Sequence, residues 1–137
     1  MSKVVNSEYI RKELSYIWPA CFLFIGDVQY ELPKRSEVWN LVVGSFIDKY
    51  KYKLEVFDCD DFGAILRAYV KQDRYVRNAS YPWPFGEIIG PEFRGIEGYH
   101  EVNVCITEDD GVILVEPQND KIWRPDSADD IATVVWM

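Results

Sequence analysis

The spacing of apolar residues changes in the middle of this chain, and that change restricts the fold more than any other feature. Up to residue 70, apolar residues recur every three or four positions, which is the spacing of one buried helix face. We expect helices that begin near Ser7, Ser36 and Cys59, the first of them stopped by Pro19. After a loop at residues 78–85 the pattern becomes strand-like. Helices first and antiparallel strands afterwards predict an α+β fold, with N-terminal helices packed on an antiparallel sheet.

Three runs after the loop are expected to be strands, namely residues 86–89, 99–107 and 112–116. Residues 131–136 predict a last strand, and residues 21–25 predict a short buried one. The run at 99–107 alternates strictly, so His100 is expected on one face and its two neighbours on the other.

The turn between the last two long runs decides which residues lie beside His100. A turn centred on Asp109 places Glu116 opposite Val102, on the same face as His100. A turn centred half a residue later places Glu116 opposite Asn103, on the other face. The sequence leaves both arrangements open.

Composition limits the size and the partners of the molecule. The chain has 137 residues, which is the length of one domain, so we treat residues 1–137 as a single domain. Its 23 acidic and 15 basic residues give a net charge of −8, which argues against nucleic acid or an anionic membrane as a partner. Three cysteines without a close pair predict neither a disulfide framework nor a zinc site. No signal peptide or membrane span is recognised, so we expect a cytoplasmic protein.

One cysteine and the single histidine are the residues best suited to chemistry. Cys59 is expected at the start of a helix, where unpaired backbone N–H groups favour a thiolate. His100 is the only histidine available as a base, and Glu116 is the candidate that would orient its ring. Each residue also has an ordinary explanation: a small buried cysteine, a structural histidine and a solvated strand end. The order cysteine on a helix, histidine on a strand and acid on the next strand is that of papain-like folds.

The sequences around these residues resemble a known family. They are Asp-Cys-Asp-Asp-Phe at 58–62, Gly-Tyr-His-Glu-Val-Asn-Val at 98–104 and Gly-Val-Ile-Leu-Val-Glu-Pro-Gln at 111–118. They are similar to the papain-like C-terminal domain of the Marasmius oreades agglutinin and its stand-alone microbial and phage relatives. The resemblance covers roughly residues 50–123. It implies a papain-like cysteine protease fold with Cys59, His100 and Glu116 in the catalytic positions. The sugar-binding β-trefoil of the agglutinin is not carried over, because the repeated Gln-x-Trp pattern is missing here.

Three aspartates around Cys59 predict a calcium site. Asp58, Asp60 and Asp61 should oppose thiolate formation at Cys59, because like charges disfavour another anion. Carboxylates at this density suit a hard cation with oxygen ligands, and Ca²⁺ among them would reverse the local field. The alternative is that the aspartates cap the helix and point to solvent.

These residues together predict a calcium-dependent papain-like cysteine peptidase that acts on a peptide or protein substrate. Cys59 would attack a carbonyl, and His100 would move the proton. Two alternatives stay open: a catalytically idle binding or accessory protein on a papain-like scaffold, and a cell-wall peptidase of the NlpC type. Trp83, between two prolines, fits either a cleft wall or ordinary core packing.

Overall fold

The structure is a computed structural model that describes residues 2–137. It contains the helices α1 (Ser7–Ile17), α2 (Arg35–Ser45) and α3 (Cys59–Val76), and the short 3₁₀ helix η1 (Ile47–Lys49). The strands are β1 (Lys3–Asn6), β2 (Phe22–Phe24), β3 (Gln29–Leu32), β4 (Phe85–Gly90), β5 (His100–Thr107), β6 (Gly111–Glu116), β7 (Lys121–Trp123) and β8 (Val134–Trp136).

Most of the strands form one mixed sheet. Its order is β2-β8-β4-β5-β6-β7, with β2 parallel to β8 and all other neighbours antiparallel, while β1 and β3 form a separate antiparallel pair. The predicted α+β class is therefore confirmed.

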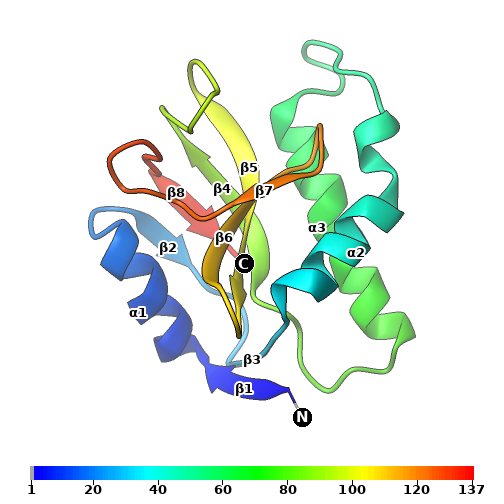
Figure 1. Cartoon of the computed structure of the whole chain (residues 1–137), viewed down its shortest axis with the longest axis vertical. Helices are drawn as coiled ribbons and strands as arrows, with labels where there is room; N and C mark the ends of the chain where they lie inside the picture. The colour runs from blue at the N-terminus through cyan, green and yellow to red at the C-terminus, as the bar shows by residue number, and fades with distance from the viewer. Residues whose placement is uncertain (1) are drawn as a thin grey trace.

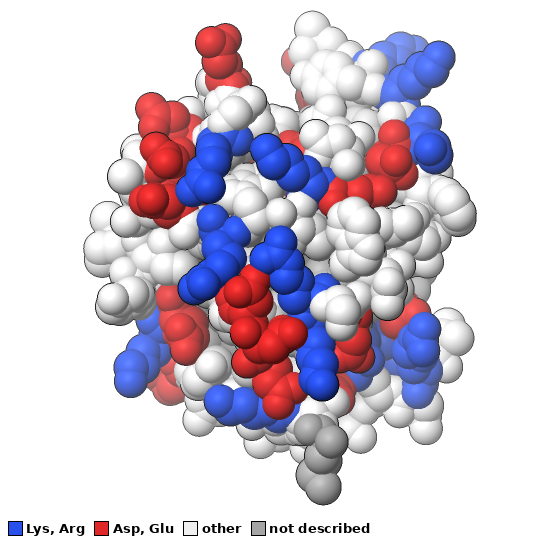
Figure 2. Space-filling view, in the orientation of Figure 1, with Lys and Arg blue, Asp and Glu red and all other residues white. Residues whose placement is uncertain are grey.

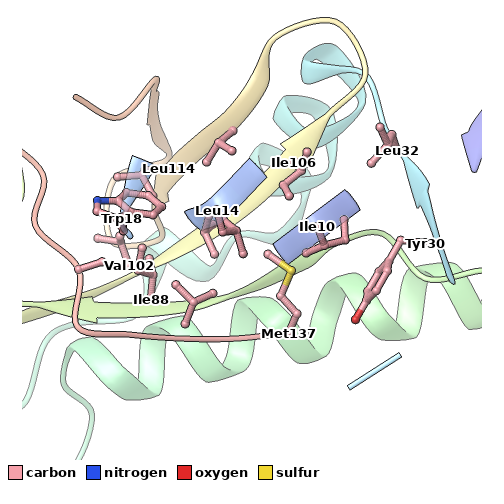
Figure 3. Close-up of a cluster of buried hydrophobic side chains, with 14 of the residues drawn as sticks. Ile10, Leu14, Trp18, Tyr30, Leu32, Ile88, Val102, Ile106, Leu114 and Met137 are labelled. Carbon is pink, nitrogen blue, oxygen red and sulfur yellow. The ribbon is translucent and has the colours of Figure 1, made fainter. Parts of the chain in front are cut away.

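Helices cover both faces of this sheet, α1 on one side and α2 with α3 on the other (Figure 1). The α1 side buries Ile10, Leu14 and Trp18 against residues of the central strands (Figure 3). Ile10 and Leu14 are fully buried, and burial of such a side chain stabilises the fold by about 1.5–3 kcal/mol. On the other face α3 packs on β4 and β5. The residues of β5 after His100 are therefore buried whichever way their side chains point.

The helices begin close to the predicted positions, although two of the caps differ. Asn6, not Ser7, is the N-cap of α1, and its side chain accepts a hydrogen bond from the Tyr9 backbone N–H at 3.0 Å. The N-cap of α2 is Lys34, and Ser36 lies inside the helix. The start of α3 at Cys59 agrees with the prediction, with Asp58 as the N-cap.

The strands show larger differences from the prediction. The sequence did not indicate β1, β3 or β7, which contain only three or four residues each. The strand predicted at residues 21–25 exists as β2, but it is not buried: Phe22 and Phe24 are 66% and 62% exposed. The reason is that β2 forms an edge of the sheet, with a neighbour on one side only.

Two further properties concern the surface. Within residues 2–137, every helix is too short or too polar to cross a membrane. On the face shown in Figure 2, acidic and basic side chains are interleaved. The ion pairs of the molecule include those of Asp110 with Arg35 and Arg124.

Candidate functional site

His100 and Glu116 form a direct pair at one end of the sheet. His100 is the first residue of β5 and Glu116 the last of β6. Asn103 pairs with Val115 in this hairpin, which is the register of a turn centred on Asp109 and puts Glu116 on the face of His100. The His100 Nε2 and Glu116 Oε2 atoms are 2.7 Å apart. The other carboxylate oxygen accepts a hydrogen bond from the Gln118 backbone N–H at 3.1 Å, so the glutamate is held from two sides.

Cys59 lies nearby, at the first position of α3, and it is half-buried. The Glu101 backbone N–H, one residue beyond His100, interacts with the thiol and lowers its pKa, but burial has the larger effect. Burial raises the pKa of the Cys59 thiol most, and the charges of Asp58, Glu101 and Asp60 raise it further. Within residues 2–137 no hydrogen bond joins the Cys59 sulfur to the His100 ring. Burial and the neighbouring charges therefore favour the thiol over the thiolate at this position.

The three aspartates converge at the start of α3. Asp58, Asp60 and Asp61 each offer a carboxylate oxygen, and these oxygens lie within 4.8 Å of one another. Asp61 accepts a hydrogen bond from the Asp58 backbone N–H at 3.0 Å, as part of a capping box. Hydrogen bonding to Asp60 is the main effect that raises the pKa of Asp58, to about 6, and the negative charges of Asp60 and Asp61 raise it further. A divalent cation would relieve this repulsion, so these residues fit a calcium ion.

A buried polar cluster lies behind the site, and the sequence analysis did not identify it. Glu101 and Asn103 project from β5 toward α3 and are 1% and 0% exposed. Asn103 donates a hydrogen bond to the Gly63 carbonyl at 2.9 Å, and a Cβ atom at Gly63 would lie 2.4 Å from Glu101 Oε2. Burial raises the pKa of Glu101 to about 9, and the nearby Glu87 carboxylate adds to the effect. Glu101 and Asn103 alternate with apolar residues, which is the sequence pattern of a strand with one solvated face, and this pattern hid the cluster.

A cleft of about 250 Å³ opens beside the His100–Glu116 pair. The cleft is also lined by Gln118 and Asn119 from the loop after β6, and by Lys121 from β7. Arg94, from the loop between β4 and β5, completes its polar lining. Lys121 makes no ion pair within residues 2–137, and Arg94 approaches its acidic partners only at 3.8 and 3.9 Å. The cleft thus offers cationic and amide groups for a ligand.

The Trp83 region does not take part in this site. Trp83 is 5% exposed and packs in the cluster beneath α2 and α3, with the Arg74 guanidinium 5.0 Å from its ring centre. The structure supports core packing for this residue, and Trp83 also lines a separate cleft of about 440 Å³ beside α2 and α3.

Comparisons with known proteins give a fold but not a family. No known protein family matches the chain, and no curated protein matches it. Two solved structures match 98% of the chain. One, described as a PSL1a–E64 complex, has a TM-score of 0.82 and 20% sequence identity. The other is Polyporus squamosus lectin bound to the human-type influenza-binding epitope Neu5Acα2-6Galβ1-4GlcNAc, with a TM-score of 0.77 and 18% identity. The chain spans about half the length of each, 50% and 49%.

These structures correct the functional prediction made from the sequence. The sequence predicts a calcium-dependent cysteine peptidase, a hydrolase, whereas a protein of the same fold is a lectin, which binds its ligand. Burial and like charges raise the pKa of Cys59, which disfavours the thiolate that a cysteine peptidase needs. The catalytic roles of Cys59, His100 and Glu116 remain untested predictions, and the comparison favours the binding alternative.

Proposed function

We propose that this chain is a catalytically idle binding protein on a papain-like scaffold. The observation that carries the proposal is the state of Cys59, because a cysteine nucleophile must be a thiolate with a base beside it. Here burial and the neighbouring carboxylates of Asp58 and Asp60 favour the protonated sulfur, and within residues 2–137 no hydrogen bond joins that sulfur to the His100 ring. The lectin with the same fold supports a binding role. The resemblance around Cys59, His100 and Glu116 supports the papain-like part of the proposal.

The proposed binding site is the cleft beside His100 and Glu116. In a chain of net charge −8, it brings together Arg94 and Lys121 with the amides of Gln118 and Asn119. Cationic and amide N–H donors are the groups that recognise a carboxylate. The proposed ligand therefore carries a carboxylate next to further hydrogen-bond acceptors. An acidic peptide segment and an acidic sugar both present this chemistry, and the trisaccharide bound by the lectin is of the second kind.

Calcium is part of the proposal as a structural ion. Asp58, Asp60 and Asp61 would hold it at the start of α3, and the crowding that raises the pKa of Asp58 supports such a site. The bound ion would supply positive charge there and fix the first turn of the helix, beside the cleft wall that His100 forms.

The proposal is tested by titrating the protein with three probes while following tryptophan fluorescence and heat of binding. The probes are Neu5Acα2-6Galβ1-4GlcNAc, the neutral Galβ1-4GlcNAc and a glutamate-rich peptide. We expect an acidic probe to bind and the neutral sugar not to bind. Lys121→Ala and Asn119→Ala should each weaken binding about tenfold, which corresponds to about 1.4 kcal/mol. The matched control is Lys51→Ala, which removes an exposed lysine outside the cleft.

Two results would contradict the proposal. One is the absence of binding by every acidic probe, or binding that Lys121→Ala and Lys51→Ala weaken equally. The other is chemistry at the thiol: a covalent adduct of E64 at Cys59, seen by intact mass, would show an activated nucleophile and not an idle one.

A further inference from the structure

The segment between α2 and α3, residues 46–57, exposes five large apolar side chains. It runs through η1 and lies at one end of the longest axis of the molecule (Figure 1). The five residues are between 53% and 70% exposed, and they are Phe46, Tyr50, Tyr52, Leu54 and Val56. Apolar side chains that gather at an exposed site mark a surface that contacts a partner or a membrane.

The tip of this segment is a tight turn with a fixed shape. Lys53 and Phe57 each donate a backbone hydrogen bond to the carbonyl of the other, both at 2.7 Å, and so close a turn over residues 54–56. The Phe57 ring packs against the cluster beneath α2 and α3, and its centre lies 4.8 Å from that of the Phe62 ring. The turn is thus anchored on the core while Leu54 and Val56 stand in solvent.

Basic side chains alternate with aromatic ones ahead of this turn. Lys49, Lys51 and Lys53 are exposed, and Tyr50 and Tyr52 lie between them in the chain. A group of basic side chains stands at the upper right of Figure 2, where Figure 1 places this segment. The net charge of −8 argues against an anionic partner for the chain as a whole, but it is an average over the surface. Residues 46–57 depart from that average, with three lysines against two acidic residues.

One of these two acidic residues opposes an anionic partner at the turn itself. The Asp48 side chain is 22% exposed and lies 3.9 Å from the Lys49 ammonium, which offsets its charge. Glu55 is exposed and stands between the two aliphatic residues of the turn. Its φ is 63°, a left-handed conformation that asparagine also tolerates, so its charge can be removed without changing the backbone.

We propose that residues 46–57 dock this protein on the surface of a bilayer that contains anionic lipids. Leu54 and Val56 enter the outer part of the acyl-chain region, where an aliphatic side chain is stabilised by leaving water. Tyr50 and Tyr52 suit the level of the headgroups, because a tyrosine has an apolar ring and a polar tip. The lysines extend their apolar stems along the same boundary and present their ammonium groups to lipid phosphates.

The composition of the turn favours a bilayer over a nucleic acid. Single-stranded nucleic acid is bound by aromatic rings that stack on bases and by cations along the phosphates. The tyrosines and lysines match that pattern, but the turn does not, because Leu54 and Val56 have no π-face for a base. Leu54 is also the most exposed of the five apolar residues. An aliphatic tip needs an apolar medium, which a bilayer provides and a phosphate backbone does not.

The first experiment is co-sedimentation of the full chain with vesicles of equal parts phosphatidylcholine and phosphatidylserine, and with vesicles of phosphatidylcholine alone. EGTA is present throughout, so that calcium at the aspartates of α3 makes no bridge to the lipid. We expect binding to the mixed vesicles, much weaker binding to phosphatidylcholine, and loss of binding as salt is raised. No binding to the mixed vesicles, or equal binding to both, would overturn the proposal. So would binding of polyuridylate in place of vesicles.

Variants assign the binding to this segment. Leu54→Ser should weaken binding about tenfold or more, because it removes an apolar side chain that leaves water. Lys49→Ala and Lys53→Ala should each weaken it about fivefold, and Glu55→Asn should strengthen it by a similar factor. Val28→Ser is the matched control, since Val28 is 77% exposed but lies in the connection between β2 and β3. Equal effects of Leu54→Ser and Val28→Ser would refute the assignment.

The second experiment asks whether the turn enters the bilayer. Leu54→Trp places an indole at the tip, and lipids brominated near the headgroup end of the acyl chains quench an indole on contact. On mixed vesicles that contain brominated lipid, Leu54→Trp should lose a larger share of its fluorescence than the wild type, whereas Val28→Trp should not. Equal quenching of the two variants would show that another surface meets the membrane and would contradict the proposal.

Discussion

Glu101 offers a measurable consequence of the buried cluster behind the site. The residue is 1% exposed, and within residues 2–137 its Oε2 atom has no hydrogen-bond partner. Burial first, and the neighbouring Glu87 carboxylate second, raise the pKa of Glu101 to about 9 from an ordinary value of 4.5. Between these two pH values the folded protein holds a proton that the unfolded chain releases. The free energy of unfolding should therefore fall as pH rises through this window.

The size of the effect follows from proton linkage. A single group that is protonated only in the folded state lowers stability by about 1.4 kcal/mol per pH unit. From pH 6 to pH 8, Glu101 should remove roughly 2–3 kcal/mol, a large part of the ~5–15 kcal/mol that stabilises a typical domain. Glu101→Gln keeps the shape of the side chain but cannot ionise, so its contribution should not change with pH.

The assay is urea unfolding of the wild type and of Glu101→Gln, followed by tryptophan fluorescence at pH 6, 7 and 8. The quantity of interest is the difference between the two unfolding free energies, because other titrating groups affect both proteins equally. This difference should shift against the wild type by roughly 2–3 kcal/mol over the range. Glu97→Gln, at an exposed position, is the control and should run parallel to the wild type. Parallel curves for Glu101→Gln, within about 0.5 kcal/mol, would refute the reasoning.

Three further predictions concern stability. Ca²⁺ should raise the melting temperature and Mg²⁺ should not. Asp61→Asn should abolish the effect of Ca²⁺, while the control Glu97→Gln should leave it intact. An equal response to Mg²⁺ would mean that the aspartates act only as helix caps. Gly90→Ala should lower the free energy of unfolding by ~3 kcal/mol or more, since its Cβ would lie 1.9 Å from the Ile131 carbonyl oxygen. Gly44→Ala should raise it by ~0.5–1 kcal/mol, because Gly44 lies in α2 with open space around it. Asp130→Ala should lower the free energy of unfolding by about 3 kcal/mol, as measured with urea. The reason is that the buried carboxylate accepts hydrogen bonds from the backbone N–H groups of Arg94 and Asp126 and from the Trp123 indole N–H. Asp129→Ala, at the exposed neighbouring position, is the control and should change stability little.

The hairpin shows how far sequence reasoning reaches. Alternation over β5 and an acidic turn ending in glycine were enough to predict the strands, but two registers remained possible. The structure selects one through the turn itself: the Thr107 hydroxyl donates to the Gly111 carbonyl at 2.8 Å and accepts from the Asp110 N–H at 3.1 Å. Gly111 has a φ of 64°, which favours glycine. These side-chain contacts, and not the hydrophobic pattern, bring Glu116 to His100.

Other features depend on contacts that no local pattern contains. Glu101 and Asn103 lie in an alternating segment typical of a half-solvated strand, yet α3 covers their face. The strands β1, β3 and β7 are too short for periodicity and form because distant partners are available. The start of α3 was predictable because Asp58 caps a long apolar stripe locally. The sequence identifies Cys59, but only its burial and its surrounding charges bear on whether the thiol reacts.

The reactivity of Cys59 tests the central claim of an idle site most directly. The measurement is the rate of iodoacetamide alkylation at Cys59 between pH 6 and 10, with and without Ca²⁺, resolved by peptide mass against a free cysteine peptide. Because burial and like charges raise the pKa of this thiol, we expect it to react more slowly than the peptide at pH 7 and to ionise above the usual range. An alkylation rate at pH 7 well above that of the peptide, and lost in His100→Ala, would contradict the account and show a working nucleophile and base.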